Sequence, residues 1–347
     1  MFRTFSGKTA DEAWLQIVEA LRCEPNGPAQ SGRGGLTQEI LHAAIAVDNA
    51  AARWVISRHP AINPAYAFAE LIWTINGRED SAFLTYFNSK LPELAGDGPT
   101  FHGAYGKRLR RHLGFDQFAR AYSALKENPD SRQVVLQIWD GEIDLPASDG
   151  RPVAADIPCN IVSLLKVRNG RLEWMQVMRS NDIFRGIPYD FVQFTFLQEI
   201  MAGWLGVEVG AYCHVSDSLH AYIKDIPRIL SATTVQSEPD TSGLTLPFAE
   251  SDAAFRQLAI AVDQIVRADS SASLLLSTLH SCALPLGYRD MLAVLTAEGL
   301  RIRGAKDAYM EAIDACTNPL YRQLWGRWLD RYPSRRISHE KDQALTS

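Results

Sequence analysis

A predicted β-hairpin near the middle of the chain constrains the fold more than any other segment. Ile161 to Val167 is mostly apolar, and Leu172 to Met178 forms a second run of similar length. Arg168-Asn169-Gly170 lies between them, and Asn-Gly readily supplies the positive φ angles of a tight hairpin turn. Pairing of the two strands would bring their outer ends together, so Cys159 and Arg179 should lie side by side. A cysteine next to an arginine suggests a thiolate nucleophile.

Length, charge and cysteine distribution favour an enzyme with a small-molecule partner. The chain has 347 residues and a formal net charge of −5, which allows one large domain or two. The absence of a dense Lys/Arg tract argues against polymeric nucleic acid as the main partner. The five cysteines are dispersed without CxxC spacing, as expected for reduced thiols, and the histidines lack metal-ligand spacing. We therefore expect no metal site.

The N-terminal segment is predicted to form an amphipathic helix and not a secretory signal. Thr9 to Glu12 fits a helix capping box, and apolar residues from Trp14 to Leu21 recur at helical spacing. No apolar run reaches membrane-spanning length, so we expect no membrane partner and a cytoplasmic protein.

Helical and strand patterns alternate along the chain, without repeats or low-complexity tracts. The predicted elements are helices over 39–59 and 64–76, a strand over 133–139, the hairpin, a helix over 191–205 and a strand over 207–214. A loop-like stretch over 237–251 is followed by several predicted helices over 253–331. We expect a catalytic domain over 1–234 and a helical C-terminal extension over 235–347, whose role the sequence does not indicate.

Several separate motifs occur together in one order. They are Gly32-Arg33-Gly34, the helix with Glu70 and Trp73, Ala104 to Lys107, Asp130-Ser131-Arg132, Pro158 to Phe191, and His214 to Tyr222. Over roughly residues 30 to 225, this set resembles the thymidylate synthase superfamily. The resemblance implies an α+β fold with a mixed sheet and packed helices, to which the C-terminal helices are added. It also implies a homodimer that binds a pyrimidine nucleoside monophosphate and a folate.

The chemistry of this family explains the central cysteine. C5 of a pyrimidine is a poor nucleophile until a thiolate adds to C6, after which C5 can attack an electrophilic one-carbon unit. The resemblance implies that Cys159 is this nucleophile and that 5,10-methylenetetrahydrofolate supplies the carbon. Arg179 would favour the ionised thiol electrostatically. For an isolated cysteine, the alternative is a small buried hydrophobic residue.

Glu70 is the second candidate catalytic residue, because it is an acid within an otherwise apolar helical pattern. Burial would raise its pKa and suit it to proton transfer through water to the base. The alternative is a structural glutamate paired with an arginine.

The resemblance also assigns the nucleotide-binding residues. Arg33, Arg179 and Ser180 would bind the phosphate from one subunit, and the partner subunit's Arg132 would complete the site. Arginine suits this task because its planar guanidinium makes bidentate, charge-assisted hydrogen bonds. Alone, each arginine could equally be a solvated surface charge.

A second group of residues would contact the sugar and the folate. His220 and Tyr222 resemble the pair that holds the 3′-hydroxyl, although one extra residue separates Asp217 from His220 here. Asp182 and Gly186 match a folate-side aspartate and a close-approach glycine, and Trp73 is assigned to the same side. Asp182 also counts among the substrate-binding residues.

Asp190 is the departure from the family pattern that most affects the expected substrate. It occupies the place of an asparagine in Gly-x-Pro-Phe-Asn, and asparagine can accept from N3–H and donate to O4 of uracil. A protonated aspartic acid would instead donate to N3 and accept from N4 of cytosine, whereas an ionised one has no donor for O4. Aspartate at this place is also found in the cytidylate hydroxymethylase branch. The alternative is that Asp190 caps the following helix.

Three further departures are Gln133 in place of a second arginine, Asn160 in place of histidine, and a different C-terminal end. A site that is less sealed at the C-terminus favours attack by water and hence a hydroxymethyl product. The predicted function is therefore 5-hydroxymethylation of dCMP or CMP. The alternatives are a thymidylate synthase or cytidylate methylase, which would deliver a methyl group, and a non-catalytic relative that binds nucleotide.

Overall fold

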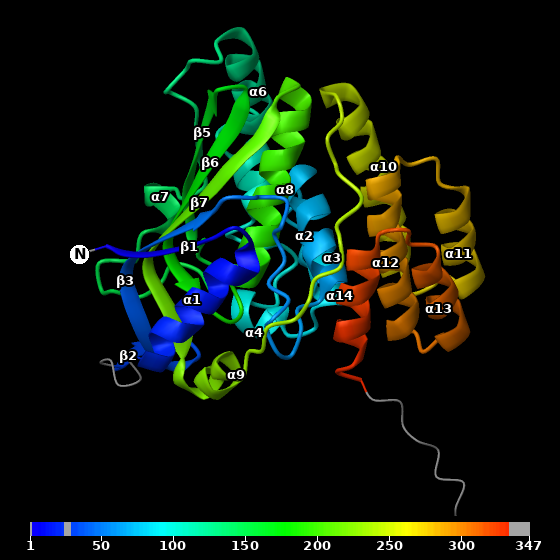
Figure 1. The fold of residues 1–347 in the computed structure, drawn as a ribbon, viewed down its shortest axis with the longest axis horizontal. Helices are drawn as coiled ribbons and strands as arrows, with labels where there is room; N and C mark the ends of the chain where they lie inside the picture. Colours follow the sequence, from blue (N-terminus) through cyan, green and yellow to red (C-terminus); the bar gives the residue numbers. More distant parts are fainter. Residues whose placement is uncertain (1, 24–28, 333–347) are drawn as a thin grey trace, which may run out of the picture.

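A mixed β-sheet forms the centre of the molecule (Figure 1). The computed structural model describes residues 2–23 and 29–332, and within them the strand order is β1-β3-β7-β6-β5-β4, with β2 paired to β3. The strands are β1 (Arg3–Gly7), β2 (Ala29–Gly32), β3 (Gly35–Val47), β4 (Val135–Gln137), β5 (Asn160–Arg168), β6 (Arg171–Asp182) and β7 (Glu208–Tyr222). The β1–β3 and β6–β7 pairs are parallel and the other pairs are antiparallel.

Helices cover one face of the sheet, and a second group of helices packs outside them (Figure 1). The N-terminal and central helices are α1 (Ala10–Cys23), α2 (Pro64–Ile75), α3 (Ser81–Phe87), α4 (Leu91–Ala95), α5 (Tyr105–Lys107), η1 (Arg108–His112), α6 (Gln117–Glu127), α7 (Gly141–Asp144) and α8 (Ile187–Leu205). The remaining helices are η2 (Ile223–Asp225), α9 (Ile226–Leu230), α10 (Phe248–Val266), α11 (Ala272–Ser281), α12 (Leu286–Ile302), α13 (Lys306–Asp314) and α14 (Pro319–Leu329). Because α2 contacts α8 as well as α10, α12 and α14, it lies between the sheet layer and the C-terminal helices.

The predicted fold class is confirmed, and so is the predicted hairpin. β5 and β6 pair from Asn160 with Met178 to Arg168 with Arg171. Asn169 and Gly170 have φ angles of 52° and 74°, the left-handed values that a two-residue hairpin turn requires. The chain folds tightly here because the turn is encoded locally.

The helix predicted over residues 39–59 is wrong, because most of its first half is strand β3. Ala43, Ile45 and Val47 are buried at every second position, and β3 pairs with both β1 and β7. Alanine, leucine and glutamate favour a helix locally, but pairing in the centre of a sheet overrides that preference. Residues 48–59 contain no helix.

The other predicted elements are present with shifted ends. The predicted helix over 64–76 is α2, whose cap Asn63 accepts hydrogen bonds from the amides of Ala65 and Tyr66. The predicted apolar helix is α8, and the strand after it continues to Tyr222 as β7. Strand β4 is shorter than predicted. The N-terminal helix is α1, and Thr9 Oγ1 accepts from the amide of Glu12 at 3.1 Å, as in a capping box.

Buried contacts of Glu199 join α8 to the segment that precedes the C-terminal helices. Arg53 donates to Glu199 on α8, and the other carboxylate oxygen of Glu199 accepts from the amide of Leu244 at 2.6 Å. The Arg53 guanidinium also lies 3.7 Å from the ring centre of Phe196. One hydrophobic core runs through both groups of helices.

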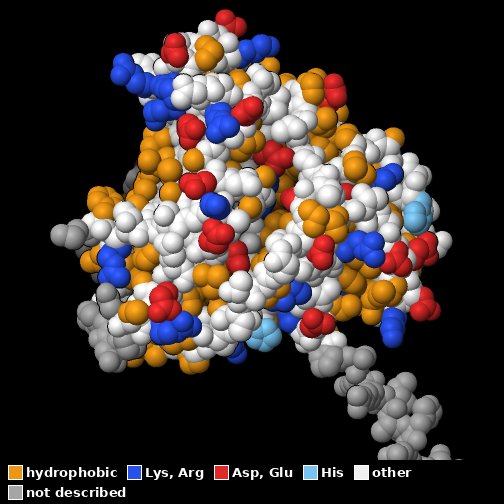
Figure 2. Space-filling model, in the orientation of Figure 1, with side chains coloured by type: hydrophobic (Ala, Val, Ile, Leu, Met, Phe, Trp, Pro, Cys, Tyr) orange, Lys and Arg blue, Asp and Glu red, His pale blue; other side chains and the backbone are white. Residues whose placement is uncertain are grey.

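The surface in Figure 2 carries basic and acidic side chains interspersed, so this face presents no continuous basic tract. No helix in the described part of the chain meets the length and hydrophobicity needed to cross a membrane.

Candidate active site

The candidate nucleophile lies at the open end of the hairpin, where the sequence predicts it. Cys159 directly precedes β5, and its carbonyl accepts from the amide of Arg179 at 2.9 Å. The Arg179 guanidinium is held by the carbonyls just before the cysteine, with Nε 2.9 Å from the oxygen of Pro158 and Nη2 3.1 Å from that of Ile157. The predicted side-by-side placement is therefore confirmed.

The environment of the Cys159 thiol keeps it protonated when the site is empty of substrate. Burial raises the pKa of the thiol, and Arg179 opposes this rise only in part. The nearby charges of Asp190 and Asp156 raise the pKa further, while that of Arg33 lowers it. Arg179 thus acts in the expected direction but with a smaller effect than burial.

Asp190 lies buried in the first turn of α8 and faces the same region. Burial raises its pKa to about 7, and a 2.9 Å hydrogen bond from Asn181 Nδ2 to Asp190 Oδ2 opposes the rise. The cap position of α8 is Gly186, so Asp190 does not cap this helix. A carboxyl with this pKa exists in both protonation states near neutral pH.

Glu70 belongs to α2 and is partly buried. Burial raises its pKa to about 8, and the charge of Asp190 contributes to the rise. The Tyr66 hydroxyl donates to Glu70 Oε1 at 3.3 Å. Among the described residues no cation forms an ion pair with Glu70, so it is not a structural ion-pair partner in this part of the chain.

Asn181 and His214 form a buried hydrogen-bonded chain behind Asp190. Asn181 Nδ2 lies 3.1 Å from His214 Nε2, and His214 Nδ1 lies 2.9 Å from the hydroxyl of Tyr212. His214 is also 3.2 Å from the hydroxyl of Ser216. The sequence analysis missed this chain, although the alternation of Tyr212 and His214 on a predicted strand is a signal for one shared face.

The predicted phosphate and sugar residues gather at the ends of β6 and β7. Ser180 Oγ lies 3.3 Å from His220 Nδ1, and Asp182 pairs with His220 across the two strands. The His220 and Tyr222 rings lie 5.7 Å apart, so they share one face despite the extra residue after Asp217.

The two remaining predicted phosphate ligands are exposed. Arg33 follows β2 and donates to the carbonyl of Leu94, and the glycine after it lies close to the ring of Tyr222. Its charge reaches the Cys159 thiol. Arg132 is exposed between α6 and β4, next to the exposed Gln133.

The predicted folate-side residues have distinct surroundings. Asp182 Oδ1 accepts from the amides of Phe184 and Arg185, at 2.7 and 2.9 Å. A Cβ on Gly186 would lie 2.2 Å from Asn181 Oδ1, so the glycine is required by contact with a protein group. Trp73 is buried, and its indole donates to the carbonyl of Asp80 at 2.9 Å.

Asn160, at the position where the family resemblance implied histidine, is part of a buried amide network. Its Oδ1 accepts from Gln176, whose Oε1 accepts from Ser163 at 2.6 Å and from the indole of Trp174 at 3.3 Å. These bonds fix the side chain of Asn160, the first residue of β5, next to Cys159 and close to Tyr105.

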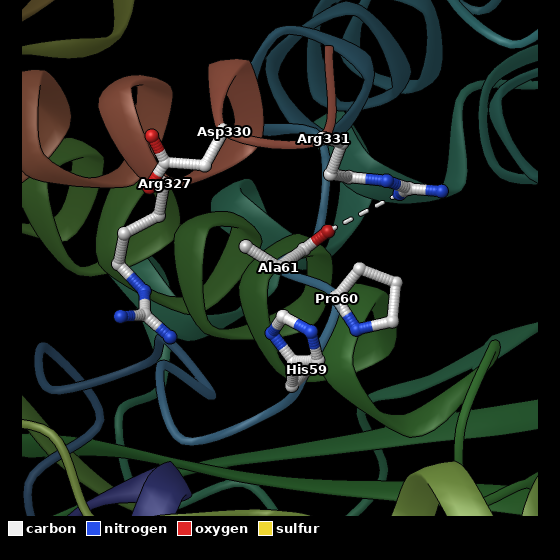
Figure 3. Close-up of a pocket in the computed structure, with 6 residues that line it drawn as sticks. All are labelled: His59, Pro60, Ala61, Arg327, Asp330 and Arg331. Atoms are coloured by element: carbon white, nitrogen blue, oxygen red, sulfur yellow. Dashed lines mark hydrogen bonds between the residues drawn. The ribbon is translucent and has the colours of Figure 1, made fainter. Parts of the chain in front are cut away.

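A basic pocket of about 320 Å³ lies where the end of α14 meets the segment before α2 (Figure 3). Its lining consists of His59, Pro60, Ala61, Arg327, Asp330 and Arg331. Arg331 donates to the carbonyl of Ala61 at 3.4 Å, and Arg327 donates to that of Ile56 at 3.0 Å. The adjacent Arg58 donates to the carbonyl of Phe184, two residues from Asp182, so the pocket borders the predicted folate side.

A partly buried cysteine beside an arginine, a buried and a partly buried acid with raised pKa values, and a mixed sheet define an α+β protein with a cysteine-centred site. The chain belongs to the thymidylate synthase family, which it matches over residues 19–267. The match extends beyond residue 234 and includes α10, whereas α11 to α14 lie outside it.

Two phage proteins are similar to this chain, and both are named deoxyuridylate hydroxymethyltransferase. The protein of Bacillus phage SP01 is 34% identical over 233 residues, which cover 64% of this chain and 59% of the phage protein. The protein of Pseudomonas phage M6 is 36% identical over 181 residues, covering 52% of this chain and 50% of the phage protein. The chain thus spans between half and three-fifths of the length of these relatives.

Proposed function

We propose that this protein is a folate-dependent pyrimidine nucleotide 5-hydroxymethyltransferase, which uses 5,10-methylenetetrahydrofolate and a cytidine monophosphate, dCMP or CMP. The observation that carries the proposal is the placement of Cys159 beside Arg179, facing Asp190, in a chain of the thymidylate synthase family. The names of the two phage relatives support hydroxymethyl as the group transferred. We further propose that the protein acts in the cytoplasm.

Cys159 is the proposed nucleophile. Its thiolate adds to C6 of the base, which makes C5 able to attack the one-carbon unit of the folate. Because burial raises the pKa of the thiol, the proton must leave as the nucleotide binds. A nucleotide phosphate near Arg33 and Arg179 would partly neutralise their charge and so weaken their effect on the pKa of the thiol. The reaction therefore also needs a group that accepts the thiol proton. Glu70, whose pKa is raised to about 8, is the proposed group that exchanges protons with the base through water.

The proposed phosphate site consists of Arg33, Arg179 and Ser180, completed by the partner subunit's Arg132, and His220 and Tyr222 hold the sugar. The Ser180–His220 contact supports one continuous site for phosphate and sugar. The face of the sheet that the helices leave uncovered supports a homodimer, because apolar side chains on it are only partly buried in the single chain. These are Val162, Leu164, Met175, Val177, Cys213 and Val215.

The folate is proposed to bind beside Asp182 and Gly186, with Trp73 supporting that side from the core. Arg327 and Arg331 in the pocket at α14 support placing the negatively charged tail of the folate there, because opposite charges attract. Both arginines lie beyond the segment that matches the family.

The raised pKa of Asp190 supports cytosine as the base, because a protonated carboxyl can donate to N3 and accept from N4. A second candidate substrate is deoxyuridylate, which the names of the two phage relatives favour. A protonated carboxyl that is turned around can accept from N3–H and donate to O4 of uracil, so Asp190 is chemically compatible with both bases.

Mass spectrometry of reaction products tests the proposal. The protein is incubated with methylenetetrahydrofolate and with dCMP, CMP or dUMP in separate reactions. We expect a hydroxymethyl adduct on a cytidine nucleotide, and none with Cys159→Ala. Hydroxymethyl on dUMP would establish the second candidate, and a methyl product would identify a synthase or methylase. Tight nucleotide binding without product would indicate a non-catalytic relative.

A further inference from the structure

Asn181 lies directly behind the carboxyl that is proposed to face the base. Its Nδ2 donates to Asp190 Oδ2 at 2.9 Å and approaches His214 Nε2 at 3.1 Å. All three side chains are buried. A side-chain amide nitrogen carries two hydrogens, and these two contacts use both of them.

The surroundings of Asn181 fix the direction of these hydrogen bonds. Burial lowers the pKa of His214 to about 3, so the ring is neutral and has one donor and one acceptor nitrogen. Because Nε2 accepts from Asn181, the ring proton is on Nδ1, where it points to the Tyr212 hydroxyl at 2.9 Å. The oxygen of Asn181 lies against Gly186. A reversed amide would place its oxygen against Asp190 Oδ2, and two acceptors would then face each other whenever Asp190 is ionised.

This directionality determines where the proton of Asp190 resides. A protonated carboxyl has one carbonyl oxygen and one hydroxyl, and the carbonyl oxygen is the better acceptor for a third group. Donation from Asn181 to Oδ2 therefore places the proton on Oδ1. Cytosine and uracil require opposite orders of donor and acceptor from this carboxyl, so the oxygen that carries the proton selects between them.

We propose that Asn181 is a specificity-determining positioning residue, which fixes the proton of Asp190 on Oδ1 and thereby sets the preference between cytosine and uracil. The inference rests on the proposed function, because it concerns the same site. The inference holds for either candidate base, because the same hydrogen bond from Asn181 would enforce a preference for cytosine or a preference for uracil. Other titratable groups whose charges interact with Asp190 are Glu70 from α2, Tyr105 from α5, Cys159 before β5 and Tyr212 from β7.

The test compares Asn181→Leu, which keeps similar size but removes the donor, with the wild-type protein. Calorimetry measures the binding of dCMP and dUMP, and steady-state kinetics measures kcat/KM for both. We expect the preference between the two bases to shrink by about tenfold or more, because the proton can then occupy either oxygen. We also expect the alkaline limb of the pH profile to move to higher pH, because the Asn181 bond lowers the pKa of Asp190.

Asn76→Leu is the matched control, because Asn76 is also a partly buried amide with two carbonyl acceptors but lies at the far end of α2. It should change neither the base preference nor the pH limb. If Asn181→Leu does not fold, His214→Phe removes the acceptor that orients the amide and should weaken the preference in the same direction.

An unchanged base preference in folded variants at Asn181 or His214 would overturn the inference, as would a wild-type protein that binds both bases equally. Failure of the proposed function can be distinguished from failure of this inference. In that case no product forms, while calorimetry still reports the binding preference between the two nucleotides. A wild-type protein that binds neither nucleotide would overturn both.

Discussion

Acids at two places in the molecule have very different partners. Where α8 meets the segment before α10, Glu199 binds Arg53 and a backbone amide, and among the C-terminal helices Asp290 accepts from Ser242 and from both the amide and the hydroxyl of Thr317. At the hairpin end, each buried acid has a single side-chain donor, from Asn181 to Asp190 and from Tyr66 to Glu70.

This difference separates acids that hold the structure together from acids that remain able to exchange protons. A buried carboxylate with a cation and several donors stays ionised, whereas one with a single donor gains a proton as its pKa rises. The pKa values of about 7 for Asp190 and about 8 for Glu70 follow from this shortage of partners. Perturbed values of this kind are typical of functional sites.

The largest expected effect concerns two cysteines, one from each half. Cys159→Ala should lower kcat/KM by about four orders of magnitude or more, because the nucleophile is lost. Cys316→Ala should leave activity unchanged and cost about 1 kcal/mol of stability, since Cys316 is buried among the C-terminal helices. Product assays and urea unfolding measure both; equal activity losses would break the distinction between the two regions.

A second comparison uses Arg53, which binds Glu199, and Glu70 at the hairpin end. Arg53→Met leaves Glu199 buried without its cation and should lower the free energy of unfolding by about 3 to 5 kcal/mol. Glu70→Gln should leave stability unchanged or raise it, because a buried acid without a cation is replaced by a neutral group, yet it should reduce turnover. Chemical denaturation with parallel kinetics checks both. A strongly destabilised Glu70→Gln protein would mean that Glu70 is structural.

A third prediction concerns pH. The pKa of Asp190 rises from 3.8 to about 7 on folding, so between these pH values the folded state binds more protons than the unfolded chain. Wild-type stability should therefore fall as pH rises through this window, by up to about 4 kcal/mol from this group. Asp190→Asn should remove that part of the pH dependence, and exposed Asp97→Asn should not. Urea midpoints at pH 5 and pH 7.5 provide the measurement.

The smallest expected effect lies at the pocket in Figure 3, which joins the two halves. Arg331→Ala should raise KM for methylenetetrahydrofolate by about three- to tenfold with kcat unchanged. The substitution removes a solvent-exposed charge, whose interaction with the folate tail should contribute about 1 kcal/mol to binding. Arg322→Ala on the same helix serves as the control, as it is exposed and does not line the pocket. An equal change in both variants would assign the effect to general surface charge.

The sequence correctly predicted those structural features that depend on residues close together in the chain. The hairpin, and with it the pairing of Cys159 with Arg179, follows from a local Asn-Gly turn, and His220 and Tyr222 share a face because strand side chains alternate. Strand β3 could not be predicted, since its pairing partners are remote in sequence and its own composition favours a helix.

The same limit explains the missed parts of the site. Asn181 and His214 meet only because β6 and β7 are parallel neighbours, and the pocket at α14 joins residues near 60 to residues near 330. The thiol pKa required knowledge of burial, which outweighs the Arg179 charge that the sequence did indicate. The roles of the individual site residues stay predictions until variants are assayed.

The parallel pairing of β6 with β7 has a consequence for how such proteins diversify. A right-handed crossover must connect two parallel strands, and here α8 is that crossover. Asn181, Asp190 and His214 consequently belong to one uninterrupted stretch of the gene product, whereas Cys159, Glu70 and Arg33 lie outside it. A single recombination event that exchanges residues 181–216 would therefore transfer Asn181, Asp190 and His214, together with Asp182 and Gly186, and would leave Cys159, Glu70 and Arg33 in place.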